Sequence, residues 1–440
     1  MKTLQISNYN SSGLNPLFSS INTVEIEDTP FDKGGFGETY FSQSINGKPL
    51  RIPQVVKVFV DDGSGSAKRG IQTILRLQAQ IRSLNIELAK RQETPIQNII
   101  ALGALPQFSF EGRLNNKTVL GYSANYLDNK KWLNFDKLFN EDDVSKKKNY
   151  LNTYYNLPLD RRLTMAHQLA QGFSYLERMK FVYADLNPKN FFVNVNDTEI
   201  CLIDYDGGAV MDASGNKPET FGKLGEWLAP EIESQLRANN TGIIKVDLHT
   251  DTWAVAICIH FLLFNYHPLF YLKIRSDNER TYLAKYAYPF IDKRDSNYRR
   301  EIDNTYNRYV AKLKSQIPDA IVKLFSETIN KGHQNPNQRI SYKQWLLVIS
   351  RTVNIATDKK PSLLTTTTPA SPPRSSTSSS GIGSSQAFGQ AASSANTIPH
   401  GNTSQNTNSL PPLSKYCKIC KKPYYNFTLS KYCSYCGKAR

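Results

Sequence analysis

Two acidic motifs separated by a short apolar stretch contain the residues best suited to chemistry. In YADLNPKN, the carboxylate of Asp185 and the carboxamide of Asn190 stand five residues apart, and in IDYDGG, Asp204 and Asp206 precede two glycines. This set suits phosphoryl transfer, because one aspartate can orient a hydroxyl group while another aspartate and the asparagine hold Mg²⁺ against nucleotide phosphates. A polar turn between two apolar strands is the alternative interpretation of either motif alone.

A glycine-rich hairpin upstream could supply the nucleotide. DKGGFGETY lies between two predicted strands, where glycines let backbone N–H groups approach an anion, although a tight turn alone would also favour glycine. Lys57 is a single charge inside the apolar strand QVVKVFV, and such a lysine is costly unless phosphates and a carboxylate pair with it. Apolar residues at helical spacing predict a helix over residues 67–92, and its one acid, Glu87, is the predicted partner of Lys57.

The remaining elements alternate between short strands and longer helices. Strands are predicted over residues 99–106 and 118–126, and helices over residues 161–179 and 251–264. Residues 140–160 form a charged, Tyr- and Asn-rich insertion with no clear period.

Composition excludes a protein that is disordered throughout or that is embedded in a membrane. The chain has 440 residues, of which 40% are hydrophobic, and this is enough for a sizeable core. We find no apolar run of about 18 residues that would span a bilayer, and the N-terminus lacks the pattern of a signal peptide. We therefore expect a cytoplasmic protein without a membrane partner.

The C-terminal part differs in composition from the rest of the chain. We expect a loose N-terminal arm over residues 1–23, a folded domain over residues 24–355, and a disordered Ser-, Thr- and Pro-rich linker over residues 356–414. After Asp358 the chain has no acidic residue but ten basic ones, so much of the net charge of +16 lies there.

Residues 415–440 contain four cysteines in two Cys-x-x-Cys pairs, and they predict a small zinc ribbon. Four thiolates at this spacing give tetrahedral Zn²⁺ coordination in a segment too short to build a core of its own, and an iron site or a redox pair is the alternative. The predicted structural zinc ligands are Cys417, Cys420, Cys433 and Cys436. The basic, tyrosine-rich surface of this segment would suit a nucleic-acid or protein partner. Cys201 and Cys258 stand singly in apolar surroundings and are predicted core residues.

Taken in order, these motifs resemble those of the protein kinase superfamily over about residues 24–355. DKGGFGETY resembles the glycine-rich loop, VVKVF the strand with the ATP-binding lysine, YADLNPKN the catalytic loop, IDYDGG the metal-binding Asp-Phe-Gly, and LAPE the end of the activation segment. The resemblance implies an α+β, bilobal protein-kinase-like fold with a small β-rich N-terminal lobe and a larger helical C-terminal lobe. The residues implied to bind ATP and its metal are Gly34, Gly35, Phe36, Gly37, Lys57, Glu87, Asn190 and Asp204.

The resemblance also implies a role for each catalytic residue. Lys57, fixed by Glu87, would hold the ATP phosphates, Asn190 and Asp204 would hold Mg²⁺, and Asp185 would act as the catalytic base toward a protein substrate. In the larger lobe, three residues are implied to be structural: Asp251 as a buried aspartate, and Arg339 as the partner of Glu231.

Three departures from the family pattern lie in the two acidic motifs. Ala184 replaces the usual arginine, Asn187 the usual lysine, and Asp206 the usual glycine. The resemblance is therefore to a divergent, bacterial-type serine/threonine kinase. A pseudokinase scaffold that binds nucleotide without turnover and a kinase acting on a small molecule are the alternatives.

Overall fold

The fold is known from a computed structural model of the chain. It describes residues 1–34, 37–59, 65–141, 143–212, 214–225, 227–239, 241–269, 288–289 and 300–353. The chain divides into two compact units, Met1–Thr367 and Thr368–Arg440. The predicted linker and zinc ribbon, including Cys417, Cys420, Cys433 and Cys436, lie outside the described residues, as do Gly35 and Phe36.

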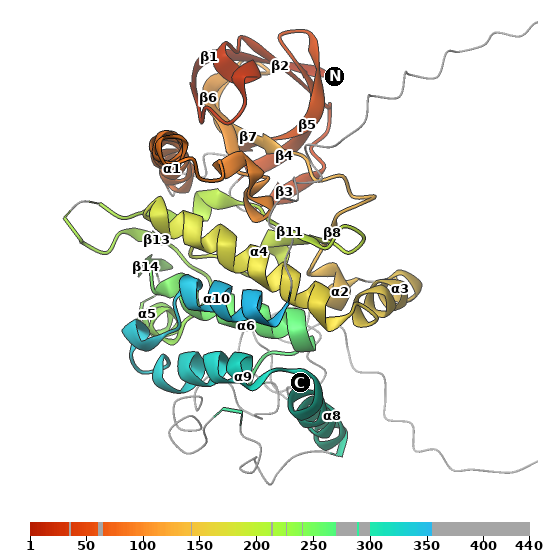
Figure 1. Cartoon of the computed structure of the whole chain (residues 1–440). Helices are drawn as coiled ribbons and strands as arrows, with labels where there is room; N and C mark the ends of the chain where they lie inside the picture. Colours follow the sequence, from red (N-terminus) through yellow and green to blue (C-terminus); the bar gives the residue numbers. More distant parts are fainter. Residues whose placement is uncertain are drawn as a thin grey trace, which may run out of the picture. The chain divides into compact units, whose positions relative to one another are not determined.

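The N-terminal part of the first unit is a β-sheet that closes on itself (Figure 1). Its strands are β1 (Lys2–Ser11), β2 (Thr23–Ile26), β3 (Asp32–Gly34), β4 (Gly37–Ile45), β5 (Lys48–Phe59), β6 (Pro106–Leu114) and β7 (Lys117–Asn125). Antiparallel pairing runs from β1 through β6, β7, β5 and β4 to β2, and β2 pairs again with β1. Closure leaves these six strands without a free sheet edge, apart from the short β3 that extends β4.

The first strand corrects our expectation of a loose N-terminal arm. β1 pairs with both β2 and β6, and its Leu4 is fully buried inside the barrel. A short 3₁₀ helix, η1 (Pro16–Ser19), follows and buries Phe18 against the ring of Phe108. Pattern reading missed the strand because its outward residues are polar and a bulge between Ile6 and Asn8 shifts the apolar alternation.

Truncating Leu4 should show how far the barrel depends on its first strand. Leu4 packs in one apolar cluster with the side chains of the other barrel strands, including Val24 and Val56. We expect Leu4→Ala to lower the free energy of unfolding by about 2–5 kcal/mol, because a buried leucine leaves a cavity. Chemical denaturation measures this change, and Leu17→Ala is the control because the Leu17 side chain is 67% exposed. Equal effects of the two substitutions would show that β1 is not part of the folded barrel.

One long helix packs on the side of the barrel. Helix α1 (Ser66–Arg91) agrees with the predicted helix over residues 67–92, and its buried face includes Ile74, Leu77, Ile81 and Leu88. Its C-terminus is capped by Gln92 in the left-handed conformation. The 3₁₀ turns η2 (Ile96–Asn98) and η3 (Ile100–Leu102) then lead to β6, where a strand was expected over residues 99–106.

The following residues are mainly helical, with short strands between the helices (Figure 1). The helices are α2 (Lys137–Asn140), α3 (Val144–Tyr155), α4 (Leu159–Arg178), α5 (Pro230–Ala238), α6 (Thr250–Phe264), α8 (Arg300–Gln316), α9 (Asp319–Ser326), the π-helix η6 (Glu327–Lys331), the 3₁₀ turn η7 (Pro336–Gln338) and α10 (Tyr342–Thr352). The strands and remaining 3₁₀ turns are β8 (Leu133–Asn134), β9 (Phe181–Val182), η4 (Pro188–Asn190), β10 (Phe191–Asn194), β11 (Glu199–Leu202), η5 (Tyr205–Gly207), β12 (Ala209–Val210), β13 (Glu219–Phe221) and β14 (Ile243–Lys245).

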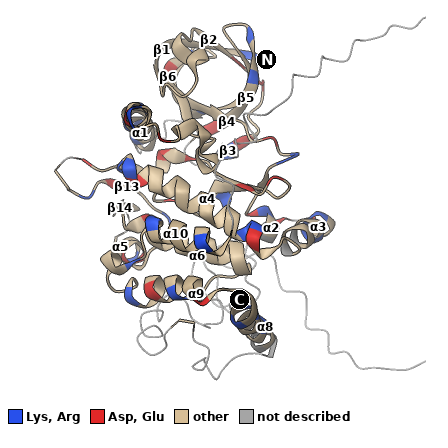
Figure 2. Ribbon diagram, in the orientation of Figure 1, with Lys and Arg blue, Asp and Glu red and all other residues tan. Residues whose placement is uncertain are grey.

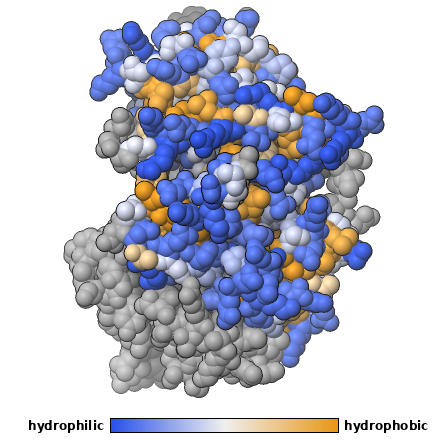
Figure 3. Space-filling model, turned by 90° about the vertical axis from the view of Figure 1, so that its left-hand side faces the viewer, coloured by the Kyte–Doolittle hydropathy of each residue, from blue (hydrophilic) through white to orange (hydrophobic). Residues whose placement is uncertain are grey.

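The core of this helical part forms around α6, whose residues are all buried. Such a helix is apolar on all sides because other elements cover it on all sides. Cys258 lies within it and Cys201 within β11, so both cysteines are core residues as predicted. No helix among the described residues is long and apolar enough to cross a bilayer. The face shown in Figure 3 is largely hydrophilic, with separate orange areas between the polar ones.

Candidate active site

A buried carboxylate fixes the loop that contains Asp185. Asp251, in the first turn of α6, is 3% exposed and accepts hydrogen bonds from the backbone N–H groups of Tyr183 at 2.6 Å and Ala184 at 2.8 Å. Ala184 has a φ of 64°, a left-handed conformation that is strained for a residue with a side chain. The two hydrogen bonds fix this turn, and the predicted role of Asp251 as a buried structural aspartate is confirmed.

Two asparagines hold the carboxylate of Asp185. Asn190 donates from Nδ2 to Oδ2 of Asp185 at 2.9 Å, and Asn187 donates from its own Nδ2 to Oδ1 at 2.9 Å. Burial of the carboxyl group and the nearby charge of Asp204 raise the pKa of Asp185 to about 6, against the lowering effect of these two hydrogen bonds. Although surrounding protein atoms desolvate the carboxyl group, the residue remains exposed to solvent, so a hydroxyl group could approach it. A carboxylate held in this way could orient a hydroxyl group.

The hairpin formed by β10 and β11 brings the second acidic motif beside the first. Its antiparallel register pairs Phe191 with Leu202, and the next residue, Ile203, donates its N–H to the carbonyl of Asn190 at 2.9 Å. The hydroxyl of Tyr183 also donates to the carbonyl of Ile203. Asp204 follows directly and has a φ of 62°, so the chain turns sharply there.

Lys57 reaches this turn from the barrel. It lies on β5 between Thr39 of β4 and Tyr122 of β7, and its side chain is 14% exposed. Its Nζ atom is 2.5 Å from Oδ1 of Asp204 and 2.8 Å from Oδ1 of Asp206. The hydroxyl of Tyr122 lies 3.2 Å from the same oxygen of Asp206. The predicted need of this lysine for anionic partners is therefore met by the IDYDGG motif.

The charged groups in this cluster shift one another's pKa values in opposite directions. Burial alone would lower the pKa of Lys57, but the carboxylates of Asp206 and Asp204 outweigh burial and raise it above its ordinary value. Burial and the charge of Asp204 raise the pKa of Asp206 to about 7. For Asp204, burial acts to raise the pKa, while the ammonium group of Lys57 lowers it and keeps the carboxylate ionised.

The predicted ion pair between Lys57 and Glu87 is wrong. Glu87 stands near the C-terminal end of α1, where its carboxylate pairs with Arg91 at 3.2 Å and Arg178 at 3.4 Å. Its side chain is 45% exposed. At 1.5 Å per residue, Glu87 is about 26 Å along the helix from Gly70, which faces the IDYDGG turn. The sequence identified the helix correctly but could not show which end of it approaches Lys57.

The glycine hairpin is described in part. Gly34 on β3 pairs with Gly37 on β4, so the two strands meet at the tip as predicted. A Cβ atom at Gly37 would lie 2.6 Å from the carbonyl oxygen of Val58, which no real side chain tolerates. Glycine is therefore required at Gly37 by the close approach of β5.

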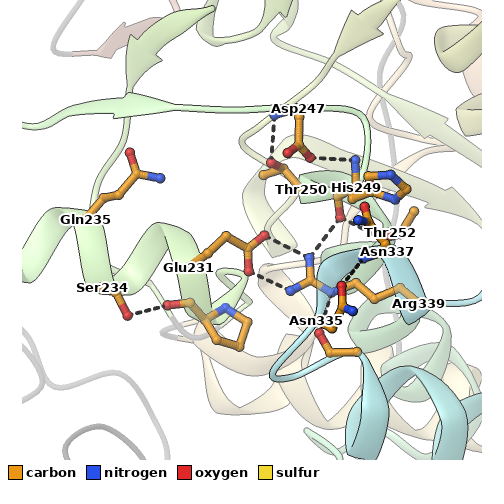
Figure 4. A network of polar contacts seen from close by, with 12 residues as sticks. Glu231, Ser234, Gln235, Asp247, His249, Thr250, Thr252, Asn335, Asn337 and Arg339 are labelled. Carbon is orange, nitrogen blue, oxygen red and sulfur yellow. Dashed lines mark hydrogen bonds and ion pairs between the residues drawn. The ribbon is translucent and has the colours of Figure 1, made fainter. Parts of the chain in front are cut away.

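A partly buried ion pair joins the LAPE motif to a late loop (Figure 4). Arg339 donates to both carboxylate oxygens of Glu231, at 2.8 and 2.6 Å, and to the carbonyl oxygens of His249 and Gly332, each at 2.9 Å. The predicted pairing of Glu231 with Arg339 is confirmed. This pair anchors the start of α5 to the helical core.

Two residues of the cluster were not predicted as parts of the site. Asp206 was recognised as part of the second acidic motif and as a departure from the family pattern but was given no role, and Tyr122 did not stand out at all. An Asp-x-Asp spacing directly after a strand was the available signal for Asp206, because such a turn can present two carboxylates to one cation. Tyr122 is one of several aromatic residues on the barrel strands, and its sequence context gives no indication of its role.

The available oxygen atoms fit Mg²⁺ bound together with nucleotide phosphates. Mg²⁺ sites of this kind use one or two protein oxygens, with phosphates and water completing the octahedron. The side chain of Asp204 is 39% exposed, and Nδ2 of Asn190 donates to Asp185, so the amide oxygen of Asn190 is the atom that could bind a metal. Within the described part of the chain, no three His, Cys, Asp or Glu side chains are grouped to hold a metal by themselves.

Comparison with known proteins identifies the family of the chain. The family model "Protein kinase domain" matches residues 114–347, more than half of the chain, and this range includes both acidic motifs but begins after Lys57. Among curated proteins, cGMP-dependent protein kinase 2 of Rattus norvegicus is 33% identical over 95 residues, which are 22% of this chain and only 11% of that protein. Among solved structures, a rhoptry kinase from Toxoplasma gondii covers 80% of this chain and 84% of its own at 11% identity, with a TM-score of 0.46. On the family match, the chain belongs to the protein kinases.

Proposed function

We propose that this protein is an ATP-dependent protein kinase that transfers the γ-phosphate to serine or threonine hydroxyl groups. The observation that supports this proposal most strongly is the cluster in which Lys57 of β5, Asp185 and Asn190 of the YADLNPKN loop and Asp204 of the IDYDGG turn lie together. Each of these residues has a place in phosphoryl transfer, where the protein acts mainly by positioning and by charge.

The roles follow from the chemistry of each side chain. Lys57 binds nucleotide phosphates, and Asp204 with the amide oxygen of Asn190 holds Mg²⁺. When bound, Mg²⁺ neutralises phosphate charge. Asp185 orients the substrate hydroxyl and accepts its proton, and Asn187 and Asn190 keep the carboxylate in place. Asn187 stands where the family pattern has a lysine, and here it supports the base.

The proposal is tested by transfer of labelled phosphate from ATP to the protein itself or to a generic basic protein. We expect Mg²⁺-dependent incorporation by the wild type and a loss of at least a hundredfold in Lys57→Met, because the substitution removes the phosphate-binding cation. Phosphoamino-acid analysis should find phosphoserine or phosphothreonine. Wild-type incorporation no higher than that of Lys57→Met contradicts the proposal. Nucleotide binding without transfer would then indicate a pseudokinase, and ATP consumption with small alcohols a small-molecule kinase.

A further inference from the structure

Helix α1 has no acidic residue in the segment that lies near Lys57. The helix approaches the IDYDGG turn through small residues: a Cβ atom at Gly70 would lie 3.6 Å from Cβ of Asp206, and the Thr73 hydroxyl donates to the carbonyl of Gly208 at 3.3 Å. The charges of α1 are almost all basic, as its colouring in Figure 2 shows. Its one acid, Glu87, is turned to Arg91 and Arg178 instead.

The carboxylate of Asp206 lies beside the ammonium group of Lys57. The Asp206 side chain is 7% exposed, and one oxygen contacts both Nζ of Lys57 and the hydroxyl of Tyr122. Oδ1 of Asp204 also lies 2.5 Å from Nζ of Lys57, but the Asp204 side chain is 39% exposed, so part of its carboxylate faces solvent, where a metal could approach. Both aspartates of one turn therefore contact Lys57, but they differ in burial, and Asp206 is the more buried of the two.

We infer that Asp206 is the positioning residue that anchors Lys57, in place of an acid on helix α1. Asp204 remains available for the metal because Asp206 provides Lys57 with a second carboxylate. The lysine and the metal ligand are thus fixed by the same three-residue turn. Withdrawing α1 would not remove an acid from Lys57, so movement of this helix cannot switch the site off by breaking that pair. The inference rests on the proposed function for its catalytic meaning, but the anchoring itself can be measured without turnover.

A double-mutant cycle on unfolding tests the anchoring without any ligand. The cycle compares Lys57→Met combined with Asp206→Asn and Lys57→Met combined with Glu87→Gln, each against its single variants. We expect the unfolding equilibrium constants of the first pair to deviate from additivity by about tenfold or more, because a charged hydrogen bond is lost only once. The second pair should be additive within about twofold. Coupling of Lys57 to Glu87, or none to Asp206, overturns the inference.

Nucleotide affinity gives the functional readout, measured by titration calorimetry at a fixed Mg²⁺ concentration. We expect Asp206→Asn to weaken ATP binding about 10–100-fold, because Lys57 then competes with Mg²⁺ for Asp204, and raising the Mg²⁺ concentration should recover part of the loss. Asp206→Glu should bind better than Asp206→Asn, and the exposed Asp212→Asn is the matched control, with wild-type affinity. An Asp206→Asn variant with wild-type affinity, or a wild type that binds no ATP, contradicts the inference. A wild type that binds ATP but transfers no phosphate contradicts only the proposed function.

Discussion

Replacing Asp185 by asparagine should lower the rate of phosphate transfer by about 10²–10⁴-fold while leaving ATP affinity nearly unchanged. The substitution keeps the shape of the side chain but removes the group that accepts the proton of the hydroxyl nucleophile. Asn187 and Asn190 donate to both carboxylate oxygens, so the new amide also loses one of its two acceptors and will turn in the site. Steady-state kinetics with ATP and a protein substrate separates the two effects, because a base contributes to kcat and not to ground-state binding.

A matched control for this substitution is available on the same lobe. Asp160 is an exposed aspartate in the first turn of α4, and Asp160→Asn makes the same chemical change away from the site. We expect it to keep wild-type kcat. If Asp185→Asn kept a kcat within a few-fold of the wild type, Asp185 would not be the base.

Replacing Arg339 by alanine should lower the free energy of unfolding by about 3–5 kcal/mol. The side chain is fully buried, and its removal leaves the carboxylate of Glu231 and two backbone carbonyls without their donor. The guanidinium group also stacks over Trp253 at 5.4 Å from the ring centroid, and this contact is lost as well. Urea denaturation measures the change, since the midpoint and the slope together give the free energy.

Arg237 provides the comparison on the same helix as Glu231. It pairs with Glu233 one turn away, and its side chain is 42% exposed. Solvent screens such a pair, so Arg237→Ala should cost no more than about 1 kcal/mol. Similar losses in the two variants would mean that the buried pair does not hold α5 against the core.

The sequence was sufficient for the long helices α1, α4 and α6 and for most residues of the candidate site. Lys57, Asp185, Asn190 and Asp204 each stand out because a polar or charged residue beside apolar strands is costly unless it has a function. The roles of Asp251 and Glu231 could be expected only from the resemblance to kinases. In the structure, Asp251 accepts a hydrogen bond from the backbone of Tyr183, and Glu231 pairs with Arg339. Both contacts agree with the roles that the resemblance implies.

The sequence was insufficient where long-range packing decides the outcome. Closure of the barrel by β1 depends on pairing with β6, about a hundred residues later, and no local pattern shows that partner. The insertion over residues 140–160 had no clear period, and α3 forms there with a cap from Asp143 onto Ser145 and Lys146. The choice between Glu87 and Asp206 as the partner of Lys57 depends on how α1 is placed, which composition does not reveal.

A crystal structure of the protein with Mg²⁺ and a non-hydrolysable ATP analogue tests the central claim most directly. The account predicts the metal on Asp204 and Asn190, the phosphates within reach of Lys57, and the Lys57 ammonium group still paired with Asp206. A nucleotide bound elsewhere, or Lys57 paired with Glu87 in the complex, would contradict it.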